Sequence, residues 1–325
     1  MRARIVATGS YAPKKVMTNE ELAKLVETSD EWITERTGIK ERRIAADGET
    51  TSELAYLASR QALEEAEIKG SDLDMIIVAT VTPDMFFPAT ACILQDRLQA
   101  NGTPAFDLSA GCAGFIYALA VAEQYLRRGA AKKILVVGAE ILSRILNWQD
   151  RITCVLFADG AGATVLVAEE GERGILSTHL GSDGAYGHLI CIPGGGSAEP
   201  ATHESIDKGR HYIRMQGNET FKLAVRVLGD ISLAALKQNN IQASDLALLI
   251  PHQANLRIIT ACAKRLGVPM EKVYVNVDRY GNTSSASIPL ALDEAVKAGR
   301  IKENDLVLLA SFGAGLSWGS ALVRW

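Results

Sequence analysis

The sequence has no apolar run long enough to cross a bilayer, and its first residues include arginines but no apolar stretch of signal-peptide length. Its five cysteines are scattered and form no C-x-x-C pair. These absences argue against a disulfide framework and against a zinc site, and they are typical of a reducing compartment. The sequence therefore predicts a cytoplasmic protein that needs neither a membrane nor a metal.

A strong charge of either sign is also lacking, since 34 Lys and Arg residues stand against 38 Asp and Glu, a net charge of -4. This balance gives no general attraction to nucleic acid or to anionic membranes. Two glycine-rich segments lack the spacing of nucleotide sites. The segment 193–200 has no Gly-Lys-Ser/Thr ending, and 159–163 has no third glycine at the dinucleotide-binding position. We expect no nucleic-acid partner and no nicotinamide or flavin cofactor.

The chain is long enough for a large core, with 325 residues of which 48% are hydrophobic, and it contains an internal repeat. In each copy the pattern runs helix, buried strand, helix, strand, helix, strand, which predicts an α/β fold in layers. We therefore expect two duplicated halves, residues 1–173 and 174–325. The repeat rests on two matches at nearly one offset, Ile68–Leu73 with Ile241–Leu246 and Phe106–Cys112 with Asn276–Asn282.

Cys112 is the candidate nucleophile. It lies in Ser109-Ala-Gly-Cys-Ala-Gly114, between a short apolar strand at 105–108 and a helical pattern at 113–128. Unpaired backbone N–H groups at a helix N-terminus favour a thiolate, which can lower a cysteine pKa from about 8.5 to roughly 3.5–7.5. The other four cysteines have no glycine-flanked turn into a helix and are interpreted as inert.

His252 and Asn282 follow strands in the second half. His252 comes directly after the apolar strand 247–250, and Asn282 lies at the turn into a helix at 284–298. Taken singly, a satisfied histidine and a helix N-cap explain them. Ligands bind at the carboxyl ends of strands in α/β sheets, and Cys112 occupies the same edge in the first half. Together the three supply a nucleophile, a hydrogen-bond partner and an amide donor, the groups that acyl transfer needs.

Several motifs in this order resemble those of the β-ketoacyl-acyl-carrier-protein synthase III family, the initiating condensing enzymes of bacterial fatty-acid synthesis. They are the Gly-Cys-Ala-Gly turn, Pro251-His-Gln-Ala-Asn255, Tyr280-Gly-Asn-Thr-Ser-Ser-Ala-Ser287 and Phe312-Gly-Ala-Gly-Leu-Ser-Trp-Gly319. The likeness covers the whole chain, from Ser29-Asp-Glu-Trp-Ile33 to Trp318-Gly-Ser-Ala-Leu-Val-Arg324. It implies the thiolase-like fold, which agrees with the duplication.

The resemblance implies a ping-pong reaction with no cofactor beyond the coenzyme A thioester that serves as substrate. Cys112 would take an acyl group from acyl-CoA, after which malonyl-acyl-carrier protein would lose carbon dioxide and attack the thioester. His252 and Asn282 would stabilise the enolate, and the backbone N–H groups of Cys112 and Ala314 would hold the condensation oxyanion. The family commonly has three glycines after Phe312, whereas this chain has Ala314 in the middle position.

The resemblance also assigns binding residues and a homodimer. In the family, Phe87 crosses the dimer interface and lines the partner's acyl pocket, and Phe312 also lines an acyl pocket. The coenzyme A adenine would lie between Trp32 and Arg151. The other coenzyme A residues would be Arg36, Thr37, Gly217 and Asn255, and the basic residues facing the acidic carrier protein would be Lys222, Arg257, Lys264 and Arg265.

Other functions are compatible with parts of this pattern. Type III polyketide synthases share the Cys, His and Asn set, so a related CoA-dependent condensing enzyme is the nearest alternative. A biosynthetic thiolase needs a second catalytic cysteine, which the final glycine-rich segment lacks. A papain-like hydrolase is not expected to be a duplicated α/β chain, and a non-catalytic scaffold would leave Cys112 unacylated. The pattern does not specify the acyl primer, because one methylene in a pocket is worth only about 1–3 kcal/mol.

Overall fold

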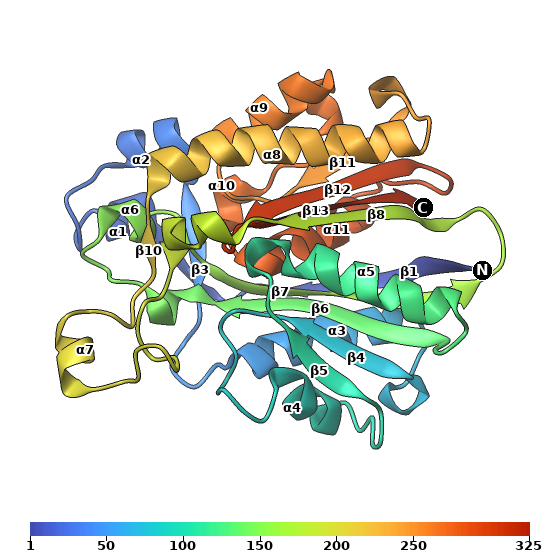
Figure 1. Ribbon diagram of the computed structural model, residues 1–325, viewed down its shortest axis with the longest axis horizontal. Helices are drawn as coiled ribbons and strands as arrows, with labels where there is room; N and C mark the ends of the chain where they lie inside the picture. The colour runs from blue at the N-terminus through green and yellow to red at the C-terminus, as the bar shows by residue number, and fades with distance from the viewer.

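The computed structural model describes residues 1–325, which form two stacked β-sheets with helices between and outside them (Figure 1). The strands are β1 (Arg2–Tyr11), β2 (Lys15–Thr18), β3 (Glu41–Ile44), β4 (Met75–Ala79), β5 (Ala105–Leu108), β6 (Lys133–Ile141), β7 (Asp159–Glu169), β8 (Gly174–Ser182), β9 (Ile190–Cys191), β10 (Arg214–Met215), β11 (Leu248–Pro251), β12 (Leu306–Gly313) and β13 (Ser317–Arg324). The α-helices are α1 (Asn19–Leu22), α2 (Asp30–Thr37), α3 (Thr51–Glu65), α4 (Thr90–Arg97), α5 (Gly114–Arg127), α6 (Arg151–Cys154), α7 (His203–Asp207), α8 (Gly217–Gln238), α9 (Leu256–Leu266), α10 (Val277–Tyr280) and α11 (Ser287–Lys297). None of the helices is long and apolar enough to span a membrane.

The two main sheets have the same construction. The first has the order β1-β7-β6-β4-β5, in which β6, β4 and β5 are parallel and β7 is antiparallel to both neighbours. The second has the order β8-β13-β12-β11, with β12 and β11 parallel and β13 antiparallel to both neighbours. A parallel bridge from Leu249 to Val273 stands where β5 stands in the first sheet. This correspondence supports a division before Gly174, the first residue of β8, which stays a prediction.

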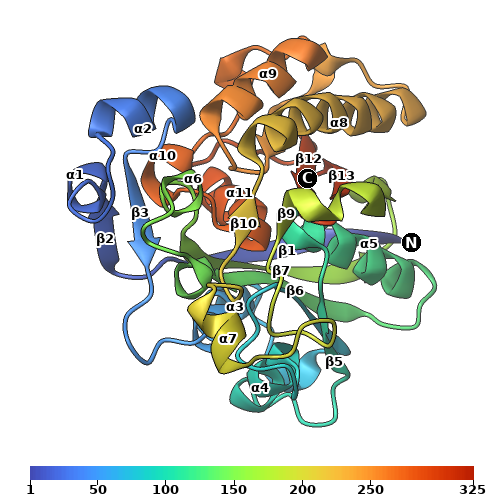
Figure 2. The same ribbon diagram turned by 60° about the vertical axis from the view of Figure 1, so that its left-hand side comes forward.

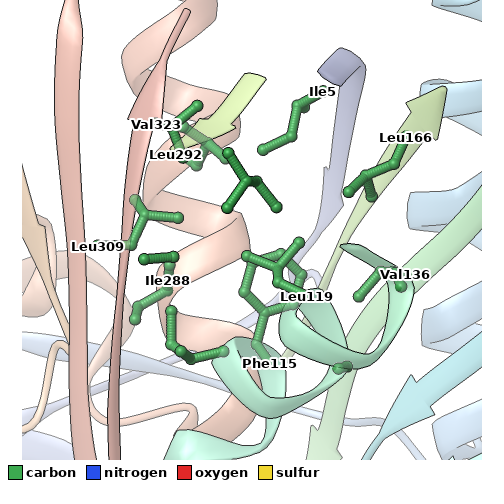
Figure 3. Close-up of a cluster of buried hydrophobic side chains, with 14 of the residues drawn as sticks. Ile5, Phe115, Leu119, Val136, Leu166, Ile288, Leu292, Leu309 and Val323 are labelled. Atoms are coloured by element: carbon green, nitrogen blue, oxygen red, sulfur yellow. The ribbon is translucent and has the colours of Figure 1, made fainter. Parts of the chain in front are cut away.

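Helices α5 and α11 lie between the sheets, while α3 covers the outer face of the first sheet and α8 that of the second (Figure 1). The apolar residues predicted to share one face of α5, among them Phe115 and Leu119, are buried. Figure 3 shows these two side chains packed with Ile288 and Leu292 of α11 and with residues of both sheets. The two central helices therefore share one core. Burial of each such side chain contributes about 1.5–3 kcal/mol to the stability of the fold.

The antiparallel strands β1, β7, β8 and β13 were not predicted by the internal repeat, which indicated only helices and parallel strands. The reason is clearest in β7, which begins Asp-Gly-Ala-Gly, a composition typical of a loop. Its position between β1 and β6 supplies partners on both edges, and this pairing outweighs the weak strand preference of glycine. The α/β fold class is confirmed.

Several segments gather at the end of the molecule to which the N-terminus of α5 points. Figure 2 turns this end forward and shows α2, α6, β10 and the start of α8 there. Residues of these elements line one cavity together with the turns that follow β11 and β12. The predicted catalytic and coenzyme A residues are found around this cavity.

Candidate active site

Cys112 lies in a single 3-10 turn, Gly111–Ala113, which leads directly into α5. The backbone N–H groups of Cys112 and Ala314 act to lower the pKa of the Cys112 thiol. Neither N–H takes part in a backbone hydrogen bond. The hydroxyl of Ser284 also acts to lower the pKa of the Cys112 thiol. Two unpaired amide donors beside a nucleophile are the groups that an oxyanion hole requires.

Glycines allow the two loops of this site to touch. Gly111 has a φ of +55°, and a Cβ there would lie 2.7 Å from the carbonyl oxygen of Ala314. A Cβ on Gly313 would lie 2.6 Å from both the nitrogen and the Cβ of Cys112. Ala314 is not among the residues with positive φ, so its methyl group is accommodated without backbone strain. The departure from three successive glycines leaves the backbone donor in place.

The predicted low pKa of Cys112 is wrong for the unliganded pocket. Burial raises the pKa of the thiol to about 11, and the nearby Glu140 carboxylate raises it further. Hydrogen bonds from Ser284 and from the backbone of Ala314 and Cys112 act in the opposite direction but do not outweigh the loss of solvent. The resting nucleophile is therefore a thiol, and its proton must leave during acyl transfer.

His252 follows β11, and its ring is buried. Burial lowers the pKa of His252 to about 3, so the ring is neutral at any physiological pH. Its Nδ1 lies 2.6 Å from the hydroxyl oxygen of Ser287, which also accepts a weak bond from the backbone N–H of Gln253 at 3.4 Å. No other acceptor for the Ser287 hydroxyl lies in reach, so we infer that this hydroxyl donates its hydrogen bond to Nδ1. The proton of the neutral ring is then on Nε2. Nε2 then serves as a donor to the cavity.

Asn282 is held by its own loop. Its Oδ1 accepts a hydrogen bond from the backbone N–H of Ser284 at 2.9 Å, and its backbone pairs with Leu156 and Ala158. The Nδ2 amide group has no acceptor within the protein and is left as a donor. Asn282 thus acts as more than a simple N-cap.

The three predicted catalytic residues line one cavity of about 410 Å³. Its walls are mostly apolar, and they include Cys112, His252 and Asn282. The cavity is also lined by Trp32, Arg36, Thr37, Arg151, Gly217, Asn255, Phe312 and Ala314, which are the predicted coenzyme A residues together with one acyl-pocket residue and one oxyanion residue. A mostly apolar pocket with a few convergent polar groups is typical of a small-molecule site.

At the entrance the guanidinium of Arg151 lies 4.7 Å from the centre of the Trp32 ring, and that of Arg36 lies 4.9 Å from it. For an adenine to lie between them, the guanidinium of Arg151 must therefore move away from the Trp32 ring by the thickness of one aromatic ring. The amide of Asn255 donates to the Arg36 carbonyl at 3.0 Å and accepts from the first turn of α9 at 2.8 Å. The hydroxyl of Thr37 is likewise paired with backbone groups, so these two side chains shape the wall.

Other predicted residues lie outside the cavity. The side chain of Phe87 is 84% exposed, and the adjacent Phe86 is 83% exposed. The four predicted basic residues, Lys222, Arg257, Lys264 and Arg265, are exposed on α8 and α9. Arg265 forms an ion pair with Asp230, and the guanidinium of Arg257 lies 5.2 Å from the centre of the Phe221 ring.

Three side chains of the site were not predicted. Ser284 and Ser287 stand in the motif that contains Asn282, but nothing in the pattern indicated that Ser284 lines the cavity with Cys112 or that Ser287 hydrogen-bonds His252. Glu140, fully buried near Cys112, could have been noticed because it is the one carboxylate within the otherwise apolar run 134–141. A buried charge in a central strand calls for a reason.

Comparison with known proteins agrees with this geometry. Residues 106–184 match the family model described as 3-oxoacyl-[acyl-carrier-protein] synthase III, and residues 236–325 match the model of its C-terminal part. A β-ketoacyl-[acyl-carrier-protein] synthase III of Caldanaerobacter subterraneus is 54% identical over 99% of this chain and 98% of its own length. One from Xanthomonas campestris is 55% identical over the same shares.

A solved structure supports the same relationship. The 3-oxoacyl-[acyl-carrier-protein] synthase III of Aquifex aeolicus superposes with a TM-score of 0.93 at 48% identity, covering 99% of this chain and all of that one. The predicted thiolase-like fold is thereby confirmed. With the sequence, the fold and the layout of the cavity in agreement, the chain belongs to the 3-oxoacyl-[acyl-carrier-protein] synthase III family.

Proposed function

We propose that this protein is a β-ketoacyl-acyl-carrier-protein synthase III, an acyltransferase that condenses an acyl-CoA primer with malonyl-acyl-carrier protein and so initiates fatty-acid synthesis. The observation that carries the assignment is the arrangement around Cys112. Its cavity is also lined by His252 and Asn282, each with one free donor, and by Ala314, whose backbone N–H is unpaired like that of Cys112.

In the first half-reaction, the Cys112 sulfur attacks the acyl carbonyl carbon while the thiol proton passes to solvent. Negative charge develops on the carbonyl oxygen, and the N–H groups of Cys112 and Ala314 stabilise it without having to reorient. The bond between the acyl carbon and the coenzyme A sulfur then breaks. The product is an acyl-Cys112 thioester and coenzyme A, whose sulfur takes a proton from solvent.

In the second half-reaction, the malonyl group loses carbon dioxide, and the electron pair of the broken C–C bond forms an enolate. Nε2 of His252 and Nδ2 of Asn282 donate hydrogen bonds to the thioester oxygen, which carries the developing charge. The enolate carbon attacks the acyl-Cys112 carbonyl, and the Cys112 sulfur leaves. A neutral histidine suits this role because it donates a hydrogen bond without carrying a charge of its own.

Replacing Trp32 with alanine is expected to raise the KM for acyl-CoA about tenfold while leaving the rate of the bound complex nearly unchanged. Stacking of a base on an aromatic ring is worth about 1–3 kcal/mol, and the adenine is remote from the reacting atoms. Steady-state kinetics of acylation would measure this effect. Acylation by a short thioester that lacks the nucleotide serves as the control, and an equal loss with that substrate would contradict adenine stacking.

The exposed basic residues Lys222, Arg257 and Lys264 support a docking face for an acidic carrier protein beside the cavity, whereas the Asp230 ion pair makes Arg265 a weaker candidate. The exposed Phe86 and Phe87 support a homodimer in which this loop reaches the partner's acyl pocket. The reaction as written requires no cofactor, and coenzyme A enters only as a thioester.

Intact-protein mass spectrometry tests the proposed function. The enzyme is mixed separately with acetyl-, isobutyryl- and octanoyl-CoA, and Cys112→Ala serves as control. We expect an acyl adduct that depends on Cys112, followed by its loss and the formation of 3-oxoacyl-carrier protein when malonyl-acyl-carrier protein is added. Folded protein that forms no adduct with any primer would favour a non-catalytic role. An acyl adduct that condenses with malonyl-CoA, and not with malonyl-acyl-carrier protein, would favour the polyketide synthase-like alternative.

A further inference from the structure

Gln253 follows His252 directly, and its side chain is buried without lining the cavity. The reaction described above gives it no role. Its side-chain amide makes four hydrogen bonds, all of them with backbone groups. Both hydrogens and both lone pairs of the amide are thereby used, which holds this side chain rigidly in one position.

The partners of Gln253 also fix which way its amide points, because a carbonyl oxygen only accepts and a backbone N–H only donates. The amide nitrogen Nε2 donates to the carbonyl oxygens of Pro251 at 2.8 Å and Tyr274 at 3.1 Å. The amide oxygen Oε1 accepts from the backbone N–H groups of Asn276 at 3.0 Å and Val277 at 3.2 Å. A flipped amide would lose all four bonds.

These four bonds replace a strand pairing that Pro251 interrupts. β11 pairs in parallel with the segment that follows Val273, and the N–H of Tyr274 donates to the carbonyl of Leu249 at 2.9 Å. In a regular parallel ladder the carbonyl of Tyr274 would next accept from the N–H of residue 251, but proline has none. The Gln253 amide supplies this donor. It therefore joins the end of β11 to residues 274–277, with the width of one amide group between them.

Each of the two joined segments leads to an enolate donor. On one side is His252, whose backbone N–H is bonded to the carbonyl of Ala310 at 2.8 Å. On the other side is α10, which begins at Val277 and leads through a single glycine to Asn282. The carbonyl of Val277 accepts from the N–H of that glycine at 3.0 Å, so a shift of Val277 is passed on towards Asn282.

We propose that Gln253 is a positioning residue that sets the separation between the two enolate donors, His252 and Asn282. One thioester oxygen must receive a hydrogen bond from both donors at once, so decarboxylation depends on this separation. Acylation does not depend on it, because the oxyanion donors Cys112 and Ala314 belong to other turns. The proposal rests on the proposed function and adds to it a residue on which only the second half-reaction depends.

The titratable groups on the segments around Gln253 do not hydrogen-bond its amide. They are His252, Tyr274, Asp278, Arg279, Tyr280 and, on α11, Glu294. Burial lowers the pKa of His252 to about 3 and raises the pKa values of Tyr274 and Tyr280. Glu294 is ion-paired with Arg279 at 2.9 Å. A pH dependence that appears only in a Gln253 variant therefore reports the residue introduced there.

Gln253→Glu tests the proposal because it keeps the shape of the side chain and replaces the donating nitrogen with an oxygen. The ionised carboxylate cannot donate to the carbonyls of Pro251 and Tyr274 and is repelled by both, whereas the protonated acid can donate to one of them. Burial against two carbonyl oxygens should hold the pKa of this glutamate above its usual value of about 4.3. The protonated form is the better mimic of glutamine, so decarboxylation should be lost as the pH rises.

The measurement is the release of labelled carbon dioxide from malonyl-acyl-carrier protein between about pH 5.5 and 9, with single-turnover acylation by acetyl-CoA followed in parallel. Relative to wild type, decarboxylation by Gln253→Glu should fall with rising pH to about 10²-fold below it, the loss expected for a misplacement of about 1 Å. Acylation should stay close to the wild-type rate at each pH. Gln253→Met, which removes all four bonds and cannot titrate, should lose decarboxylation at every pH.

Gln95→Glu is the matched control. The amide of Gln95 also donates to a backbone carbonyl, that of Ala100 at 2.8 Å, but it lies on α4 and does not line the cavity. Both rates should match wild type in this variant. Wild-type decarboxylation in both Gln253 variants would overturn the proposal. An equal loss of acylation and decarboxylation would also overturn it, because Gln253 would then only support the fold. A wild-type protein that neither acylates nor decarboxylates would instead reject the proposed function.

Discussion

Cys112→Ser is expected to abolish acyl transfer, with a fall in the single-turnover rate of at least about 10³-fold. A serine hydroxyl fits the space and can still receive the two backbone donors, but it is a far weaker acid than a thiol and is a poor nucleophile without a strong adjacent base. His252 cannot be that base, because its Nδ1 is bonded to Ser287 and its Nε2 carries the ring proton. Rapid quenching followed by intact-protein mass spectrometry would measure the loss.

Decarboxylation of malonyl-acyl-carrier protein by the same variant is the internal control. The enolate donors His252 and Asn282 are unchanged in Cys112→Ser, so release of carbon dioxide should persist and would show that the cavity is intact. An acyl adduct on the introduced serine that forms at close to the wild-type rate would contradict the assignment of Cys112 as a nucleophile that depends on its thiol.

His252→Ala and Asn282→Ala are expected to give the opposite pattern, with acyl-Cys112 still formed and decarboxylation lost. Removal of one donor to a developing oxyanion costs about 10²–10³-fold in rate. Release of labelled carbon dioxide from malonyl-acyl-carrier protein would measure this loss, and mass spectrometry would measure acylation. If both variants lost acylation and kept decarboxylation, the roles assigned to the two halves of the cavity would be wrong.

The buried ring of His252 also predicts how decarboxylation depends on pH. Burial lowers the pKa of His252 to about 3, so the ring is neutral above pH 4. It takes up a second proton only at more acidic pH. The wild-type decarboxylation rate should therefore show no inflection near pH 6.5, the value for an unperturbed histidine. An inflection there that disappears in His252→Gln would mean that the ring titrates in the working enzyme.

Local patterns were enough to predict the parts of the fold that they encode. The helical pattern at 113–128 predicted α5, and the turn into a helix at 284–298 predicted α11. Cys112, His252 and Asn282 line one cavity, as expected, although Asn282 follows the short helix α10 and not a strand. The antiparallel strands escaped prediction because their pairing depends on distant neighbours, as for β7, whose glycines read as a loop until β1 and β6 lie on either side.

The electrostatic properties of the site could not be predicted in the same way. A helix N-terminus is visible in the sequence, but the desolvation that raises the pKa of Cys112 depends on cavity walls drawn from many segments. The hydrogen bond from the Asn255 amide to the Arg36 carbonyl joins residues far apart in the chain. The hydrogen bond from the Ser284 hydroxyl to Glu140 likewise exists only after both halves are folded.

The central helix α5 imposes an order of events on the synthesis of this protein. Phe115 and Leu119 pack in a core that also contains Leu309 and Val323. These last residues leave the ribosome about 200 residues after the helix, a delay on the order of 10 to 40 seconds at translation rates of about 5–20 residues per second. During that interval the first half presents an apolar helix face without its partner. Chains whose translation stops early are therefore expected to aggregate or to require a chaperone. The nucleophile Cys112 and the enolate donors His252 and Asn282 become functional only together, because they lie in different halves of the chain.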